Sequence, residues 1–274
     1  MKKSIKEIIK NHSDIDRIDV ELLLCHVLKC QRVFLLSHSE KILSSEEQNQ
    51  FSNLISRRKQ GEPIAYILGK KAFWNLELIV TPDVLIPRPE TELIVEWVLE
   101  KFKDKKELVL ADLGTGSGAI ALSLAKAKPN WKIIATDASE KALSVAKGNA
   151  ENLKLNNVKF YLGNWCEALP QEKFDVIVSN PPYIEKDDEH LIRGDLRFEP
   201  KSALIADDDG FADLKAIVKQ ARIYLKDSGC LVLEHGYEQA QILREYLNGL
   251  GYQNIQTLRD VANHERVTLG NFYS

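Results

Sequence analysis

The sequence predicts an α/β protein in which a parallel sheet is preceded by a small helical domain and a linking hairpin. From residue 108 onwards, strand-like apolar runs alternate with helical patterns, an order typical of a parallel sheet with helices on both faces. Residues 1–70 show apolar side chains at helical spacing instead. We therefore expect a helical domain at 1–70, a β-hairpin connector at 71–90 and an α/β domain at 91–274.

The composition is that of an ordinary soluble protein, with 274 residues, 44% of them hydrophobic and 28% charged. No window is long and apolar enough to span a membrane, and the lysine-containing N-terminus lacks the apolar stretch of a signal peptide. The four cysteines form no CxxC pair, which argues against a metal site or a disulfide scaffold. We expect a cytoplasmic protein with reduced cysteines and no metal.

Residues 1–70 are expected to form three helices, the third from Ser45 to Gln60 with Gly61 ending it. The segment contains no cluster of catalytic residue types, so it is expected to dock a substrate. The apolar positions that predict the helices are Ile5, Ile8 and Ile9, then Ile18, Leu22, Cys25 and Leu28, then Phe51, Leu54 and Ile55.

The connector is expected to be a hairpin of 72–74 and 77–80 around Asn75, followed by a turn. The segment Val84–Glu92 then leads into a helix whose inner face carries Leu93, Ile94, Trp97 and Val98. Arg88 lies between two prolines just before this helix. It either reaches the functional site or is a simple surface arginine, and the sequence leaves both open.

The first strand of the α/β region, 108–113, runs into the turn Gly114-Thr115-Gly116-Ser117-Gly118, which lets the backbone approach a ligand and place N–H groups there. The next strand ends in Asp137, 19 residues after Gly118. At this interval a Rossmann-like fold uses a carboxylate to accept hydrogen bonds from ribose hydroxyls. A nucleoside-containing cofactor is expected. The missing sixth-position glycine and the missing Walker lysine disfavour NAD and ATP.

The fourth strand, 174–178, leads into Ser179-Asn180-Pro181-Pro182-Tyr183. Two prolines end the strand, because neither supplies a backbone N–H. The side chain of Asn180 and the carbonyls of Asn180 and Pro181 can then accept hydrogen bonds from a planar NH₂ group, which the ring of Tyr183 can cover. A proline-rich turn that merely closes the strand is the alternative, and these residues alone do not decide.

The remaining elements complete the sheet. A fifth strand is expected at 230–234 and a final pair of strands at 254–258 and 265–272, with helices at 211–225 and 237–247. The charged stretch Glu185–Glu199 is expected to be a mobile loop over the substrate. Asp112 and Glu234 are candidates for cofactor or structural roles, and the structural role is preferred for both.

The order of these elements resembles the class I methyltransferases, which use S-adenosylmethionine, and the Asn-Pro-Pro-Tyr corner resembles the branch that methylates exocyclic or amide nitrogens. Four further segments resemble the HemK/PrmC family, the glutamine N5-methyltransferases of peptide chain release factors. They are Asp19–Leu28, Val84–Glu92, Phe198–Leu204 and Leu233–Gly236. The part Ile86–Glu92 favours this family over its relative that acts on a ribosomal protein.

The resemblance implies a Rossmann-like class I methyltransferase sheet at 91–274 with an antiparallel last strand. Its implied substrate is the glutamine in the Gly-Gly-Gln loop of class I release factors. The implied cofactor-binding residues are Gly114, Thr115, Gly116, Ser117 and Gly118 at the methionine end, Asp137 at the ribose, Trp165 beside the adenine, and Asn180. Asn180, Pro181 and Tyr183 are implied as catalytic residues and, with Pro182, as substrate-binding residues.

Trp165 is alternatively a core residue. Many class I relatives carry an acid near Asn164 that accepts from the adenine amino group, and the carbonyl oxygen of Asn164 can still do so. Two other functions compete: adenine-N6 methylation of DNA and a nucleotide-binding adaptor without catalysis. A DNA methyltransferase needs a recognition domain and a basic cleft, and the net charge of −3 does not encourage stable binding to nucleic acid.

Overall fold

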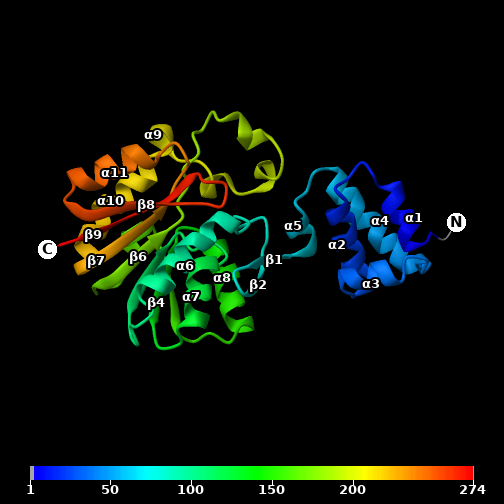
Figure 1. Cartoon of the computed structure of the whole chain (residues 1–274), viewed down its shortest axis with the longest axis horizontal. Coiled ribbons are helices and arrows are strands. Elements are labelled where there is room, and N and C mark those ends of the chain that lie inside the picture. Colours follow the sequence, from blue (N-terminus) through cyan, green and yellow to red (C-terminus); the bar gives the residue numbers. More distant parts are fainter. Residues whose placement is uncertain (1–2, 274) are drawn as a thin grey trace. The chain divides into compact units, whose positions relative to one another are not determined.

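The computed structural model describes residues 3–273, and the chain divides into two compact units (Figure 1). The helical unit extends to Gly69 and includes Ile192–Phe198, and the sheet unit comprises Lys70–Leu191 and Glu199–Ser274. Within the helical unit, Arg197 donates to the carbonyl of Gln60 at 2.9 Å. Ile192–Phe198 thus groups with the helical unit, although its place in the sequence lies within the expected α/β domain.

The described part of the helical unit contains five α-helices, whereas the sequence predicts three. The helices that correspond to predicted ones begin with serine or aspartate caps, and Ser44 and Glu47 form a reciprocal capping box. The two additional helices have only six and five residues, too few to show a periodic apolar pattern. The helices are α1 (Ile5–Asn11), α2 (Arg17–Leu28), α3 (Arg32–Ser37), α4 (Ser45–Lys59) and α5 (Ile64–Leu68).

The face that α2 buries differs from the expected one. Ile18, which begins the predicted stripe, is 51% exposed. Apolar side chains surround much of α2, so helical spacing alone fits more than one face. The side chains that α2 buries in the core of the helical unit are Val20, Leu23, Leu24 and Val27.

The expected hairpin is present, with β1 (Lys70–Phe73) antiparallel to β2 (Leu76–Ile79). Phe73 pairs with Leu76 across a two-residue loop. The buried side chain of Asn149 accepts from the backbone N–H of Ile79 at 2.8 Å and donates to the carbonyls of Ile79 and Ser117, both at 2.9 Å. One amide thereby ties the hairpin to the glycine turn.

The sheet of the sheet unit has the strand order β5-β4-β3-β6-β7-β9-β8 in the described residues. The first five strands in this order are parallel, and β9 is antiparallel to both β7 and β8, as the resemblance implies. The chain builds outwards from β3 through β4 to β5 and then returns to β6 on the other side of β3. This reversal leaves a crevice at the carboxyl ends of β3 and β6, where such sheets bind ligands. The strands are β3 (Val109–Leu113), β4 (Lys132–Asp137), β5 (Val158–Leu162), β6 (Phe174–Ser179), β7 (Leu225–Glu234), β8 (Tyr252–Arg259) and β9 (Glu265–Phe272).

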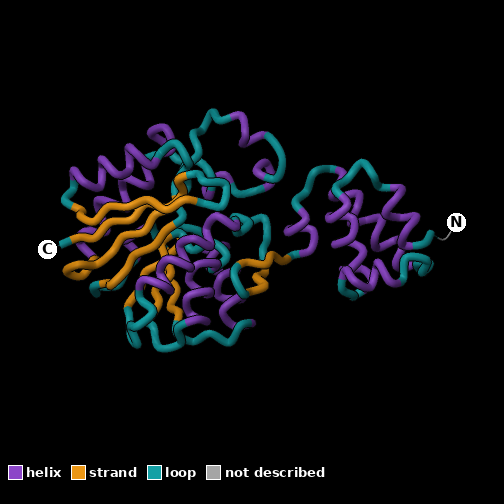
Figure 2. The backbone as a smooth tube through the Cα atoms, in the orientation of Figure 1, coloured by secondary structure: helices purple, strands orange, loops and turns teal. Residues whose placement is uncertain are grey.

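Helices flank this sheet on both faces (Figure 2). Residues of α6 and α7 pack in one core cluster, and residues of α10 and α11 pack in the other. Helix α8 is not among the predicted helices, because three of the apolar side chains that it buries are alanines, which give a weak pattern. No helix in residues 3–273 is long and apolar enough to cross a membrane. The helices are α6 (Glu92–Lys101), α7 (Ala119–Ala127), α8 (Glu140–Asn152), α9 (Asp207–Gly210), α10 (Ala212–Tyr224) and α11 (Ala240–Gly249).

Candidate active site

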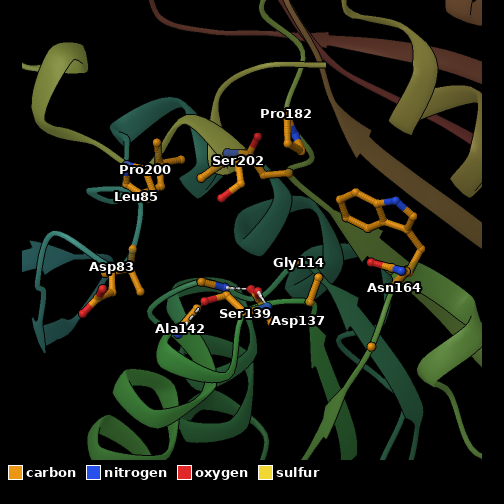
Figure 3. Close-up of a pocket in the computed structure, with 17 residues that line it drawn as sticks. Asp83, Leu85, Gly114, Asp137, Ser139, Ala142, Asn164, Pro182, Pro200 and Ser202 are labelled. Atoms are coloured by element: carbon orange, nitrogen blue, oxygen red, sulfur yellow. Dashed lines mark hydrogen bonds between the residues drawn. The ribbon is translucent and has the colours of Figure 1, made fainter. Parts of the chain in front are cut away.

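A cavity of about 250 Å³ opens at the carboxyl edge of the sheet, within the sheet unit (Figure 3). Side chains and backbone from the ends of β3, β4, β5 and β6 line one part of it, and the segments before α6 and after residue 199 line the rest. Seven residues that the sequence analysis discussed as site residues line this cavity: Gly114, Gly116, Asp137, Asn164, Trp165, Asn180 and Pro182.

Gly114 follows β3 directly and has a φ of 69°, which favours glycine. A Cβ atom at this position would lie 2.9 Å from a ring carbon of Trp165. The absence of a side chain therefore lets the indole of Trp165 close over the turn. Gly116, with a φ of 56°, is the second glycine that lines the cavity.

The backbone N–H groups of the glycine turn donate to acceptors within the sheet unit. The N–H of Thr115 donates to the carbonyl of Thr136 at 2.9 Å, and the N–H of Gly118 donates to the carbonyl of Thr115 at 2.8 Å. The N–H of Gly116 donates to Asp137 Oδ2 at 2.9 Å. Against expectation, these three N–H groups are thus already engaged, and the turn offers a ligand close approach rather than three free donors.

The other members of the turn lie behind the cavity wall. Thr115 and Ser117 are buried, and the hydroxyl of Thr115 donates to Asp112 Oδ2 at 2.7 Å. Gly118 caps α7 with a φ of 87°, where a Cβ atom would lie 2.8 Å from Leu122. The structure therefore gives Thr115, Ser117 and Gly118 a role in shaping the turn, while Gly114 and Gly116 face the cavity.

Asp137 ends β4, and both of its carboxylate oxygens are oriented by the backbone. Oδ2 accepts from Gly116 as described, and Oδ1 accepts from the N–H of Ser139 at 2.9 Å (Figure 3). Burial raises the pKa of this carboxyl, and the two backbone hydrogen bonds oppose that rise. Because a carboxylate has about four acceptor positions, two remain for hydroxyl groups in the cavity.

Trp165 has a φ of 43°, and its indole N–H donates to Asp213 Oδ1 at 3.1 Å. Asp213 was not foreseen from the sequence, because it lies 48 residues away on α10. This hydrogen bond fixes the plane of the indole beside Gly114. Asn164 precedes Trp165, and its side chain also lies at the cavity wall (Figure 3).

The Asn180 corner follows β6 without a break. The hydroxyl of Ser179 donates to the carbonyl of Leu113 at 2.7 Å, which joins the ends of β6 and β3. The side-chain NH₂ of Asn180 donates to the hydroxyl oxygen of Thr91 at 3.0 Å. Asn180 and Pro182 line the cavity, and Pro181 is buried beside them.

Tyr183 is half-buried, and its hydroxyl lies 3.5 Å from Glu234 Oε1. Burial raises the pKa of the phenol, so the hydroxyl keeps its proton. Glu234 ends β7 with only 1% of its surface exposed, and the hydroxyl of Thr91 lies close enough to its carboxyl group to favour the charged form. Burial raises the pKa of Glu234 to about 7, against the opposing effect of Thr91. Its Oε2 has no hydrogen-bond partner within residues 3–273.

Asp112 is a second buried carboxyl of the sheet edge, 1% exposed, and burial raises its pKa to about 6. Oδ2 accepts from Thr115 and from the N–H of Ala121 at 3.1 Å, and Oδ1 has no hydrogen-bond partner in the described residues. These contacts favour the structural role, because they tie β3 and the glycine turn to α7.

Arg88 is not a free surface arginine, because its guanidinium binds the fully buried carboxylate of Glu199 at 2.6 Å. Glu199 stands just before Pro200 and Ser202, which line the cavity (Figure 3). The ion pair therefore anchors the segment that re-enters the sheet unit after Phe198. A bridge between Ile184 and Ile205 joins the two ends of this excursion.

Several cavity residues were not proposed from the sequence as site residues: Asp83, Val84, Leu85, Ala138, Ser139, Ala142, Gly163, Pro200, Ser202 and Ala203. Most lie beside segments that were singled out, next to Asp137 or within Val84–Glu92 and Phe198–Leu204. Adjacency to those segments is the signal that could have found them. No group of three His, Cys, Asp or Glu side chains in residues 3–273 is placed to hold a metal.

Comparison with known proteins adds to this geometry. Residues 2–69 match the family described as the PrmC N-terminal domain, and residues 104–265 match a methyltransferase domain. The chain is 47% identical to a release factor glutamine methyltransferase of Aliivibrio fischeri, with 98% of this chain and 95% of the relative covered. It is 49% identical to one of Shewanella oneidensis, with 94% and 90% covered.

A solved methyltransferase from Pyrococcus furiosus shares the fold, with a TM-score of 0.57 and 21% identity over 81% of this chain and 100% of that one.

Proposed function

The chain belongs to the release factor glutamine methyltransferase family, and we propose that it transfers a methyl group from S-adenosylmethionine to the side-chain amide nitrogen, N5, of a glutamine. The proposed glutamine is that of the Gly-Gly-Gln loop in class I peptide chain release factors. One observation carries the proposal: a single cavity is lined both by the glycine turn with Asp137 and by Asn180. A nucleoside ligand and a substrate amide would meet there.

The residues present fit the proposed methyl donor. Gly116 leaves open space for close approach, and the remaining acceptor positions of Asp137 suit a ribose diol. The fixed indole of Trp165 offers an apolar face for an adenine ring, and Asn164 offers a carbonyl oxygen for its amino group.

When bound, S-adenosylmethionine supplies a methyl group on a positively charged sulfur, which the nitrogen takes while sulfur keeps the electron pair of the broken bond. An amide nitrogen is a poor nucleophile, because its lone pair is shared with the carbonyl. The side-chain oxygen of Asn180 and the carbonyl of Pro181 can accept its two N–H groups and direct the lone pair. Tyr183 covers the amide, and the proton that the nitrogen loses passes to solvent.

We assign the helical unit to docking of the release factor and the sheet unit to the chemistry. A protein starting near Lys71 should still bind S-adenosylmethionine in calorimetry and should methylate a release factor poorly. A short Gly-Gly-Gln peptide serves as the control substrate, because it lacks the rest of the factor. Equal rates on the whole factor with and without residues 1–70 would remove the docking role.

The proposed substrate is tested by offering labelled S-adenosylmethionine with four acceptors in parallel: a release factor, the same factor with Gln→Ala in its Gly-Gly-Gln loop, a ribosomal protein and adenine-containing DNA. Label is expected only in the unmodified release factor, and mass spectrometry should place it on the side-chain nitrogen of that glutamine. Label in the DNA, or undiminished label in the Gln→Ala factor, would overturn the proposal. We place this reaction in the cytoplasm, where release factors act.

A further inference from the structure

The side chains of Asn180, Thr91 and Glu234 come from separate parts of the sheet unit and interact with one another in that order. The Asn180 NH₂ group donates to the Thr91 hydroxyl oxygen at 3.0 Å. The Thr91 hydroxyl lies close enough to the Glu234 carboxyl group to lower its pKa, and Glu234 Oε1 also accepts from the Tyr183 hydroxyl at 3.5 Å. Thr91 and Glu234 are 4% and 1% exposed, so water does not compete for these contacts. Thr91 lies just before α6, and Glu234 ends β7.

The chemistry of these three side chains fixes which atom donates and which accepts in each contact. An ionised carboxylate has only acceptors, so the single proton of the Thr91 hydroxyl points to Glu234. The hydroxyl oxygen of Thr91 can then only accept from Asn180, which places the NH₂ group of Asn180 on that side. The side-chain oxygen of Asn180 is left free on the other side of the amide group.

The opposite orientation of the Asn180 amide would be costly. Its oxygen would face the Thr91 oxygen with no proton between them, and its NH₂ group would be the part offered to a substrate. A substrate amide also presents N–H groups, so two donors would oppose each other. Only one of the two amide orientations can therefore hold the substrate nitrogen.

We propose that Thr91 and Glu234 are positioning residues for methyl transfer: they lock the Asn180 amide with its oxygen available to the substrate glutamine. This inference rests on the proposed function and names two residues that it did not use. Neither residue is assigned to touch the reacting atoms.

The groups around Glu234 favour such a role over a stabilising one. The charges near it are Glu90, which opposes its ionisation, and Arg266, which favours it. Arg88 favours ionisation of the nearby Tyr183, and its guanidinium is already paired with Glu199. The carboxyl group thus has no salt bridge in the described residues, one of its oxygens has no hydrogen-bond partner there, and its partners are the two side chains next to the candidate acceptors.

The test compares Thr91→Val, which keeps the shape and removes the hydroxyl, with Thr91→Ser, which keeps the hydroxyl. On a release factor, Thr91→Val should lower kcat about tenfold, since one hydrogen bond is lost. Its affinity for S-adenosylmethionine should stay within about twofold, because Thr91 acts on Asn180 only. Thr91→Ser should restore most of kcat.

Thr268→Val is the matched control, since Thr268 is a buried threonine whose hydroxyl bonds to His235 and Thr257 instead. It should leave kcat unchanged, and thermal melting of all three variants separates a loss of fold from a loss of rate. A Thr91→Val protein that is folded and as active as the wild type would overturn the inference. A folded but slow Thr91→Ser protein would do so too. A wild-type protein inactive on release factors would overturn the proposed function instead.

The pH dependence of kcat in Glu234→Gln gives a second test, because replacing a residue with a purely structural role would not change that dependence. Protonation of Glu234 would let its carboxyl donate to Thr91 and reverse the direction of these contacts, so kcat of the wild type should fall as the pH drops through the pKa of Glu234. Glutamine does not titrate, and this acid limb should disappear in the variant. An acid limb that persists unchanged in Glu234→Gln would contradict the role of Glu234.

Discussion

Glu21 of the helical unit and Glu234 of the sheet unit are both buried glutamates, and the protein holds them in opposite ways. Glu21 in α2 receives hydrogen bonds from both Arg17 and Arg32, which keep its pKa below the ordinary value although burial acts to raise it. Glu234 in β7 has no such cation, and burial raises its pKa to about 7. The first arrangement stabilises a buried charge with two arginines that are more than half exposed. The second keeps an unstable charge beside a cavity, which is a pattern typical of functional sites.

The largest expected effect is on chemistry at the sheet edge. Asn180→Ala should lower kcat on a release factor about 100-fold or more, because the substrate amide loses an acceptor that orients it. Affinity for S-adenosylmethionine should change little in calorimetry. A loss confined to cofactor binding would show that Asn180 serves the cofactor rather than the substrate amide.

Asp137→Ala should act on binding instead. Ribose hydroxyls would lose a charged acceptor, a contact of about 1.5 to 3 kcal/mol, so the Kd for S-adenosylmethionine should rise about 10- to 150-fold. The carboxylate also holds the N–H groups of Gly116 and Ser139, so Asp137→Asn is the milder companion variant. Unchanged affinity in both variants would remove Asp137 from the binding site.

How far the sequence could lead depends on the range of the contacts. The glycine turn, Asp137 and the Asn180 corner were predictable, because each follows a strand whose apolar run is local. The partners of these residues were not. Asn180 and Thr91 are 89 residues apart, and Arg88 and Glu199 are 111 apart, so only the folded sheet unit brings them together. The prediction of the buried face of α2 is wrong for another reason, because the apolar residues of this helix fit more than one buried face.

The smallest effect is expected in the helical unit. Glu21→Gln should lower the free energy of unfolding by about 1 kcal/mol, a modest loss because Arg17 and Arg32 are more than half exposed. Because the pKa of Glu21 is depressed in the folded protein, its charge stabilises the fold above the ordinary carboxyl pKa. This contribution to stability is lost as the pH falls through the folded-state pKa of Glu21. Cofactor affinity should not change. Chemical denaturation at pH 7 and pH 3 tests this, and an equal loss at both would exclude the charge as its cause.

The opposite sign is expected for Glu234. Below its ordinary pKa of 4.5 the carboxyl is neutral in both the folded and unfolded protein, and as the pH rises towards 7 only the unfolded protein readily loses the proton. Stability is therefore lost as the pH rises, by at most about 3 kcal/mol above pH 7.

The central claim is that the protein keeps the buried charge of Glu234 for function. We test it by measuring the free energy of unfolding and kcat of Glu234→Gln on one preparation at pH 8. We predict a variant that is more stable than the wild type and slower on release factors. A variant that is less stable, or that is more stable with undiminished kcat, would contradict the claim.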